Sequence, residues 1–141
     1  MSHRKRSVLE KKVQADIEAA LGSEPDLLLL RNAVGKATYV NDDAHEFHVP
    51  FGLGVGSPDL VAMLRVAPSI AAWFCLEVKA EEGELDPEQV KCHAIWERFG
   101  ALIFVVRSVR DAVDALDLAR AMVRSSRREP VTYLELNRSR R

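Results

Sequence analysis

The sequence predicts an α/β domain in which a mixed central β-sheet is flanked by helices. Helical apolar spacing occurs near both ends of the chain, and short apolar runs typical of strands lie between them. A helix with strong start signals separates the last of these strands from the others. The expected order is helix, three or four strands, helix, strand, helix. At 141 residues the chain has the size of one domain with a single core.

The helices are predicted from apolar spacing and from residues that favour helix ends. They are expected over residues 7–21, 86–99 and 108–124. Ser7 is the expected N-cap of the first helix, and Gly22 follows its last turn. The second helix begins at Asp86, which is followed by proline and, three positions after the cap, by glutamine. Ser108 caps the last helix.

Short apolar runs bounded by turn residues predict the strands. They are expected at residues 27–30, 60–66, 73–78 and 102–106, with a short addition at 47–49. The run at 27–30 is typical of a buried strand. Residues 33–46 are polar and contain glycine, which predicts a loop. The run at 131–136 fits either a last strand or an ordered tail. Strands 60–66 and 73–78 are expected to pair as an antiparallel hairpin.

Charge is distributed unevenly along the chain, although the formal net charge is only −1. Residues 1–12 hold five Lys or Arg and one acid, and residues 120–141 hold seven Arg and two acids. We therefore expect a basic tail at 1–6 and a basic tail or extra strand at 126–141, around a domain at 7–125. Basic ends on an acidic body suit phosphate binding, although they are also typical of solvated tails. The candidate DNA-backbone contacts are Arg4, Lys5, Arg6, Arg124, Arg127 and Arg128.

The sequence also indicates the compartment. No apolar run approaches the roughly 18–20 residues that span a membrane, and the basic N-terminus lacks the apolar region of a secretory signal. Cys75 and Cys92 do not have the spacing of a disulfide or zinc framework. We therefore expect reduced thiols, a cytoplasmic location and no membrane partner.

Three ionisable residues are expected to meet at one end of the predicted hairpin. On a strand, residues i and i+2 share a face about 6–7 Å apart, so Glu77 and Lys79 project together. Asp59 follows a Gly-Ser-Pro turn at the start of the preceding strand, and antiparallel pairing places it beside them. Charges at the end of an apolar strand are costly unless they have partners. Two carboxylates near a main-chain carbonyl suit Mg²⁺ or Mn²⁺, and the lysine adds a positive charge beside the cation.

The motif Pro58-Asp59 followed by Glu77-Val78-Lys79 resembles the signature of the PD-(D/E)XK nuclease superfamily. The surrounding residues resemble its VRR-NUC branch, the virus-type replication-repair nucleases, over roughly residues 7–120. These residues are Glu10, Asn32, Gly35, Gly56-Ser57-Pro58-Asp59-Leu60, Gly83, Leu85, Pro87, Gln89, Gly100 and Val105-Val106-Arg107-Ser108. In length the chain is similar to the stand-alone phage and bacterial members.

The resemblance implies a restriction-endonuclease-like core with a metal site on its central strands. Asp59 and Glu77 would be metal ligands, with the main-chain carbonyl of Val78 completing the set. Lys79 would be the catalytic lysine. Taken from the residues alone, Asp59 could instead be an ordinary turn residue, and Glu77 and Lys79 an ion pair on an edge strand.

Two further site residues are implied by the resemblance, each with a structural alternative. Glu10 would be an outer acidic residue that binds the metal directly or through water, and Glu18 could take its place. Gln89 would support the site near the scissile phosphate. Both Glu10 and Gln89 also stand three positions after a potential cap, Ser7 and Asp86, and so could belong to capping boxes.

The histidines are not expected to form a metal site. His45 and His48 are three residues apart in a segment expected to be extended, where positions i and i+3 point to different faces. His93 is expected to be an ordinary helix residue, and Glu81-Glu82-Gly83-Glu84 a solvated loop.

The resemblance implies a metal-dependent endonuclease that hydrolyses phosphodiester bonds in branched DNA. For stand-alone members it further implies a homodimer that resolves four-way (Holliday) junctions, in a bacterial or phage-infected cell. Three alternatives stay open. The chain could be a PD-(D/E)XK module that binds DNA without cutting it, a restriction-type enzyme, or an α/β protein that binds no nucleic acid. A restriction-type enzyme would need a recognition insert, which is not evident here.

Overall fold

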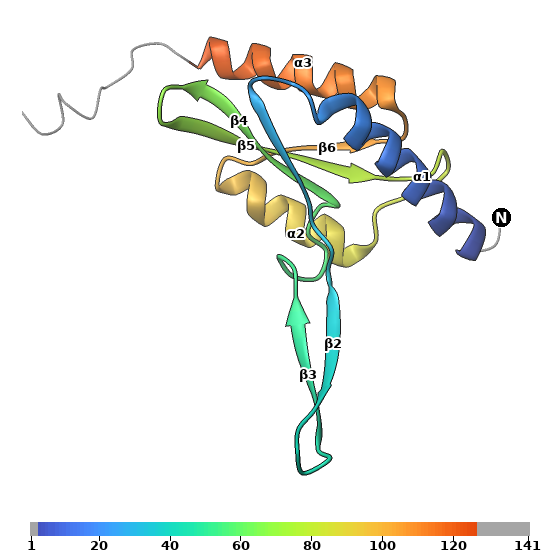
Figure 1. Ribbon diagram of the computed structural model, residues 1–141. Helices are drawn as coiled ribbons and strands as arrows, with labels where there is room; N and C mark the ends of the chain where they lie inside the picture. The colour runs from blue at the N-terminus through green and yellow to red at the C-terminus, as the bar shows by residue number, and fades with distance from the viewer. Residues whose placement is uncertain (1–2, 127–141) are drawn as a thin grey trace, which may run out of the picture.

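A four-stranded mixed sheet forms the centre of the structure, a computed structural model that describes residues 3–126 (Figure 1). Its strand order is β1-β4-β5-β6. The strands are β1 (Leu27–Arg31), β4 (Leu60–Ala67), β5 (Ile70–Val78) and β6 (Leu102–Val106). Strand β4 pairs antiparallel with β1 and with β5, whereas β5 and β6 are parallel. The predicted α/β class with a mixed central sheet is confirmed.

Helices cover both faces of this sheet. Figure 1 shows α1 (His3–Leu21) and α3 (Val109–Ser125) on one face and α2 (Pro87–Arg98) on the other. The main core lies between the sheet and the pair α1 and α3, where Ile17, Leu76 and Leu116 are almost fully buried. On the other face, Trp96 of α2 packs edge-to-face on Trp73 of β5, with 5.4 Å between ring centroids. In the main core, full burial of a large apolar side chain such as Ile17 or Leu116 contributes about 1.5–3 kcal/mol to stability.

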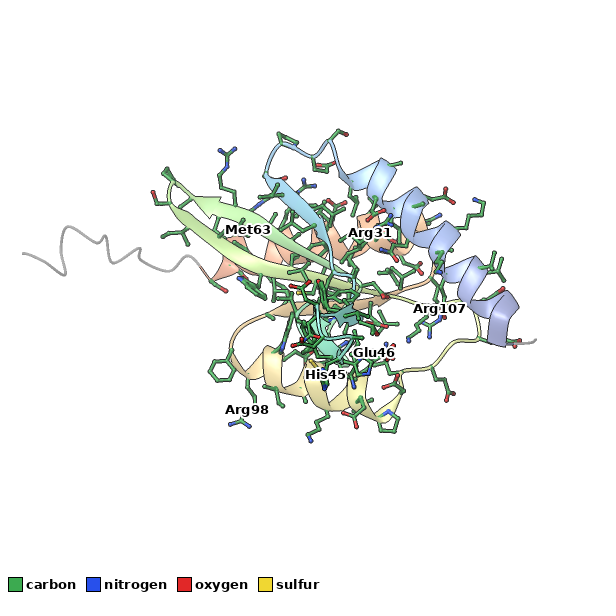
Figure 2. All side chains as sticks on the ribbon, turned by 60° about the horizontal axis from the view of Figure 1, so that its bottom comes forward. Arg31, His45, Glu46, Met63, Arg98 and Arg107 are labelled. Atoms are coloured by element: carbon green, nitrogen blue, oxygen red, sulfur yellow. The ribbon has the colours of Figure 1, made fainter. Side chains whose placement is uncertain are left out.

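A second, two-stranded sheet projects from the body of the protein. It consists of β2 (Gly35–Val40) and β3 (Glu46–Phe51), which pair antiparallel. Figure 2 looks along this hairpin, with His45 and Glu46 at its tip. Every residue of β3 is exposed. The prediction of a loop over 33–46 is therefore wrong for residues 35–40, which form β2, whereas the short strand expected at 47–49 lies within β3. The element order is α-β-β-β-β-β-α-β-α.

The first helix begins earlier than the sequence indicated. It starts at His3, so Ser7 lies inside α1 and is not its N-cap. Residues 4–6 are Arg, Lys and Arg, which favour helix, and no residue there opposes it. The backbone of residues 4–6 therefore belongs to α1 and not to a tail. Helices α2 and α3 follow their predicted caps, Asp86 and Ser108, each of which accepts a main-chain N–H three residues later.

Strand β1 lies at an edge of the sheet and is covered on one face only. Leu27 is buried, whereas Leu28 and Leu30 are about half exposed, so the expectation of a buried strand holds for one face. Arg127, Arg128 and the predicted element at 131–136 lie outside the described residues. None of the helices in the described part of the chain is long and apolar enough to cross a membrane.

Candidate metal and catalytic site

The predicted meeting of Asp59 with the end of β5 is present in the structure. Strands β4 and β5 pair with Leu60 opposite Leu76, so Asp59 lies beside the end of β5. The Asp59 Oδ2 atom accepts a hydrogen bond from the Val78 main-chain N–H at 2.8 Å. Asp59 is therefore held by the strand that carries Glu77, and it is more than a free turn residue.

The turn before Asp59 fits tightly against α2. Gly56 has a φ of +81°, and a Cβ added there would lie 2.4 Å from the main-chain oxygen of Glu88. Only glycine fits this backbone conformation and this close approach without strain. The Gly-Ser-Pro turn thus brings the start of β4 against the first turn of α2.

Asn32 holds the same turn from the other side. Its side-chain Nδ2 donates to the Ser57 Oγ and to the Pro58 carbonyl oxygen, both at 2.8 Å. Its Oδ1 accepts from the Leu53 N–H at 3.1 Å, and its own main-chain N–H donates to the Asp59 carbonyl oxygen at 2.8 Å. Asn32 therefore joins the base of the hairpin to the residue that carries the candidate metal-binding carboxylate.

Glu77, Lys79 and Gln89 form a closed polar cluster. The Glu77 side chain is 1% exposed, and its Oε1 lies 3.0 Å from the Lys79 Nζ. Gln89 of α2 donates through Nε2 to the same Oε1 at 2.5 Å and accepts from the Lys79 Nζ at 2.7 Å. The Glu77–Lys79 pair is thus buried and bonded on several sides, unlike an exposed ion pair on an edge strand.

Gln89 completes the capping box that the sequence allowed, and its side chain also belongs to the polar cluster. Its main-chain N–H donates to the Asp86 Oδ1 at 2.9 Å, and its Oε1 accepts from the Asp86 N–H at 3.0 Å, which completes a capping box. The same side chain contacts Glu77 and Lys79. The start of α2 therefore positions an amide in the cluster.

The structure also separates Glu10 from Glu18. Glu10 Oε1 accepts from the Ala80 main-chain N–H at 3.2 Å, just beyond Lys79, so its capping-box alternative does not hold. Glu18 instead pairs with Arg31, whose Nε donates to it at 2.9 Å. Of the two glutamates, Glu10 is the one beside the cluster.

Burial and mutual repulsion perturb the two central carboxylates. Burial, reinforced by the Asp59 carboxylate, raises the pKa of Glu77 to about 7 against the opposing effect of the Lys79 ammonium. Burial also raises the pKa of Asp59, with a smaller contribution from Glu10. The carboxylates of Asp59 and Glu77 therefore lie close together where little water reaches them. A bound cation would reduce their mutual repulsion.

The donor set fits a hard dication. Glu77 Oε2 is buried and has no hydrogen-bond partner among the described residues, so one carboxylate oxygen is free. Within residues 3–126 no three His, Cys, Asp or Glu side chains are grouped to hold a metal ion. Two carboxylates with a main-chain oxygen would leave the remaining positions to water, which is how Mg²⁺ is commonly bound.

The acidic segment after Lys79 is tied down by its backbone. Arg107 at the end of β6 donates through Nε to the Glu81 carbonyl oxygen at 3.0 Å and through Nη2 to that of Gly83 at 2.8 Å (Figure 2). The side chains of Glu81, Glu82 and Glu84 are exposed, as expected for a solvated loop.

The candidate DNA contacts are not all brought to one place. Helix α3 starts at the edge of the sheet where β5 and β6 end, and it runs back over the sheet (Figure 1). Arg124 in its last turn therefore lies roughly 22 Å along the helix from that edge. The backbone of Arg4, Lys5 and Arg6 belongs to α1, one to two turns before Glu10.

His93 was not expected to belong to the site. It is the buried residue of α2, and its Nε2 lies 3.6 Å from the Glu77 Oε2. The available signal was its spacing, since His93 follows Gln89 by four residues and therefore shares its helix face. His45 lies at the hairpin tip, and His48 of β3 pairs with Thr38, so both are remote surface residues as expected.

One cavity of about 370 Å³ is lined by Asp26, Leu28, Arg65 and Ile70, at the other end of β4. Comparisons of the sequence with models of protein families and with curated proteins give no match. The functional assignment therefore depends on the geometry described above.

Proposed function

We propose that this chain is a metal-dependent endonuclease of the PD-(D/E)XK type, with a restriction-endonuclease-like core and a VRR-NUC-like layout. Its substrate would be branched DNA, and a homodimer would present two sites to a four-way junction. The observation that supports this best is the convergence of Asp59, Glu77 and Lys79 at adjoining strand ends, with Gln89 bonded to two of them.

Asp59 and Glu77, with the carbonyl oxygen of Val78, would hold Mg²⁺ or Mn²⁺. A bound dication of this kind lowers the pKa of a coordinated water and offsets negative charge on phosphate oxygens. Glu10 accepts a hydrogen bond from the N–H of Ala80, the residue after Lys79, and would act on the same cation through water. The raised pKa of Glu77 means that cation binding must displace its proton near neutral pH.

Lys79 would act on the phosphate. Its side chain is only 11% exposed and its Nζ is fixed by Glu77 and Gln89, so the ammonium is preorganised. From this position it can orient a water for attack on phosphorus or stabilise the charge that develops on the phosphate oxygens. Gln89 would keep the lysine in place and orient Glu77.

DNA binding would depend on the backbone of the substrate more than on its sequence. The basic residues at positions 4–6 precede Glu10 on α1 and would supply phosphate contacts. Such contacts predict a steep salt dependence and little sequence preference. Two scissile strands of a junction require two active sites, for which a two-fold dimer is the natural geometry.

The direct test compares labelled junction, flap and duplex DNA. Binding is measured in Ca²⁺ and cleavage in Mg²⁺ or Mn²⁺, with the parent protein, Glu77→Ala and Lys79→Ala. We expect the parent to cut branched DNA, and both variants to bind without cutting. Binding without cutting by the parent would favour a non-cleaving DNA-binding module, and sequence-dependent cutting of duplex DNA would favour a restriction-type enzyme.

A further inference from the structure

The two oxygens of Glu77 have different surroundings. Oε1 receives the Gln89 amide at 2.5 Å and lies 3.0 Å from the Lys79 ammonium. Each carboxylate oxygen accepts about two hydrogen bonds, so these groups saturate Oε1. Oε2 is buried and has no hydrogen-bond partner among the described residues. Any further partner of Glu77, whether a cation or a donor, must therefore approach Oε2.

His93 faces that free oxygen. Its side chain is 8% exposed, its Nε2 lies 3.6 Å from Oε2, and this nitrogen also has no hydrogen-bond partner within the described chain. Two buried polar atoms that face one another without other partners are costly unless they interact. A shift of about 0.6 Å would bring them to ordinary hydrogen-bond distance.

Helix α2 explains why both contacts reach the same carboxylate. Gln89 and His93 are four residues apart and therefore lie on one face of the helix, one turn from each other. Gln89 donates to Oε1 of Glu77, and the His93 ring lies next to Oε2.

We infer that His93 is a positioning residue for the metal ligand Glu77: its Nε2–H donates to Oε2 and leaves the other lone pair of that oxygen directed at the cation. This inference rests on the proposed metal site. His93 would contact neither the cation nor the substrate. It would act by fixing the carboxylate, as hydrogen-bond donors behind metal ligands commonly do.

Two substitutions separate the donor from the bulk of the ring. In His93→Gln the amide Nε2 can take the place of the ring Nε2, whereas His93→Leu has a similar size and no donor. Mn²⁺ affinity is measured by calorimetry at one fixed pH, and folding by thermal unfolding in EDTA. We expect His93→Leu to bind Mn²⁺ about 10- to 100-fold more weakly than the parent. We expect His93→Gln to recover most of this loss.

The inference is overturned if His93→Leu binds Mn²⁺ as tightly as the parent, or if His93→Gln is as weak as His93→Leu. If His93→Leu binds Mn²⁺ as tightly as the parent, the proposed metal site still stands. If the parent itself binds no Mn²⁺, the metal site and the role of His93 are both contradicted. Should His93→Leu fail to fold, the parent itself gives the answer through nitrogen NMR of the His93 ring with and without Mg²⁺. A protonated Nε2 in both states supports the inference, and a bare Nε2 in the Mg²⁺ state contradicts it.

Discussion

The Asp59 Oδ2 atom and the main-chain N–H of Val78 are joined by a 2.8 Å hydrogen bond across the start of β4 and the end of β5. This bond fixes a carboxylate from one strand against the residue that separates Glu77 from Lys79. It binds Oδ2 of Asp59 to the main chain, so Oδ1 would be the oxygen that meets the proposed cation. The relative positions of the three charged groups are therefore set by strand pairing and do not depend on flexible side chains alone.

The stability of the metal-free protein should fall between pH 5 and pH 8. The pKa of Glu77 is raised from 4.5 to about 7. The stability that the protein gains from protonated Glu77 is therefore fully present below about pH 4.5 and is lost as the pH rises through about 7. The raised pKa of Asp59 acts in the same direction. The full displacement for Glu77 corresponds to roughly 3 kcal/mol. Urea unfolding in EDTA should show a smaller free energy of unfolding at pH 8.

The matched control for this dependence is Glu77→Gln, which cannot ionise. The free energy of unfolding of this variant should change little between pH 5 and pH 8. Equal losses in the parent and in this variant would show that the dependence comes from other groups.

Asn32→Ala should weaken both the fold and the metal site. The variant loses the bonds to Ser57, Pro58 and Leu53 but keeps the main-chain bond to Asp59. We expect a loss of about 1–3 kcal/mol in the free energy of unfolding, because part-buried groups lose their partners. Mn²⁺ affinity should fall because the turn before Asp59 is released. Ser57→Ala removes one of these bonds and the bond from Ser57 Oγ to the Gly54 carbonyl oxygen, but it keeps the Asn32 bonds to Pro58 and Leu53, so it should lower Mn²⁺ affinity less. Unchanged Mn²⁺ affinity in Asn32→Ala would contradict this role.

Lys79→Met should separate metal binding from cleavage. The substitution keeps an unbranched side chain that ends at the position of the lysine Cε, and it removes the ammonium, which is not a proposed metal ligand. Mn²⁺ affinity at pH 8 should be retained, whereas junction cleavage at saturating Mn²⁺ should fall by about two to three orders of magnitude. Cleavage at the parent's rate would show that the amine has no part in the reaction.

Arg120→Met should lower stability without affecting the site. Arg120 of α3 donates to Asp26 at 3.0 and 2.6 Å and to Glu24 at 2.5 Å. Asp26 precedes Leu27, which pairs with Leu64, well along β4 from Asp59. We expect a loss of about 1–2 kcal/mol, since the network is partly exposed. Thermal unfolding and Mn²⁺ calorimetry on this variant provide a control for loss of stability alone.

The sequence was sufficient to predict the central features of the candidate site. Apolar runs bounded by turns predicted the pairing of β4 with β5, and that pairing alone brings Asp59 to the end of β5. The caps Asp86 and Ser108 predicted the starts of α2 and α3, because capping is a local interaction between residues a few positions apart.

The remaining features depend on contacts that local patterns do not encode. Strands β2 and β3 pair with each other and contain no fully buried residue, so their formation does not follow from burial of an apolar face. The bond from Ala80 to Glu10 depends on how α1 packs against the sheet, and local spacing suggested a cap at Ser7 instead. His93 reaches Glu77 because α2 crosses the end of β5, which the helix sequence alone does not specify.

Calorimetric titration of Mn²⁺ into the parent protein and into Asp59→Asn tests the central claim most directly. The substitution removes one of the two charged ligands while its side-chain oxygen can still accept the Val78 N–H, so the fold should be preserved. We predict saturable uptake by the parent and an affinity at least about tenfold weaker in the variant. Absence of uptake by the parent, or equal affinity in both proteins, would contradict a metal site at Asp59 and Glu77.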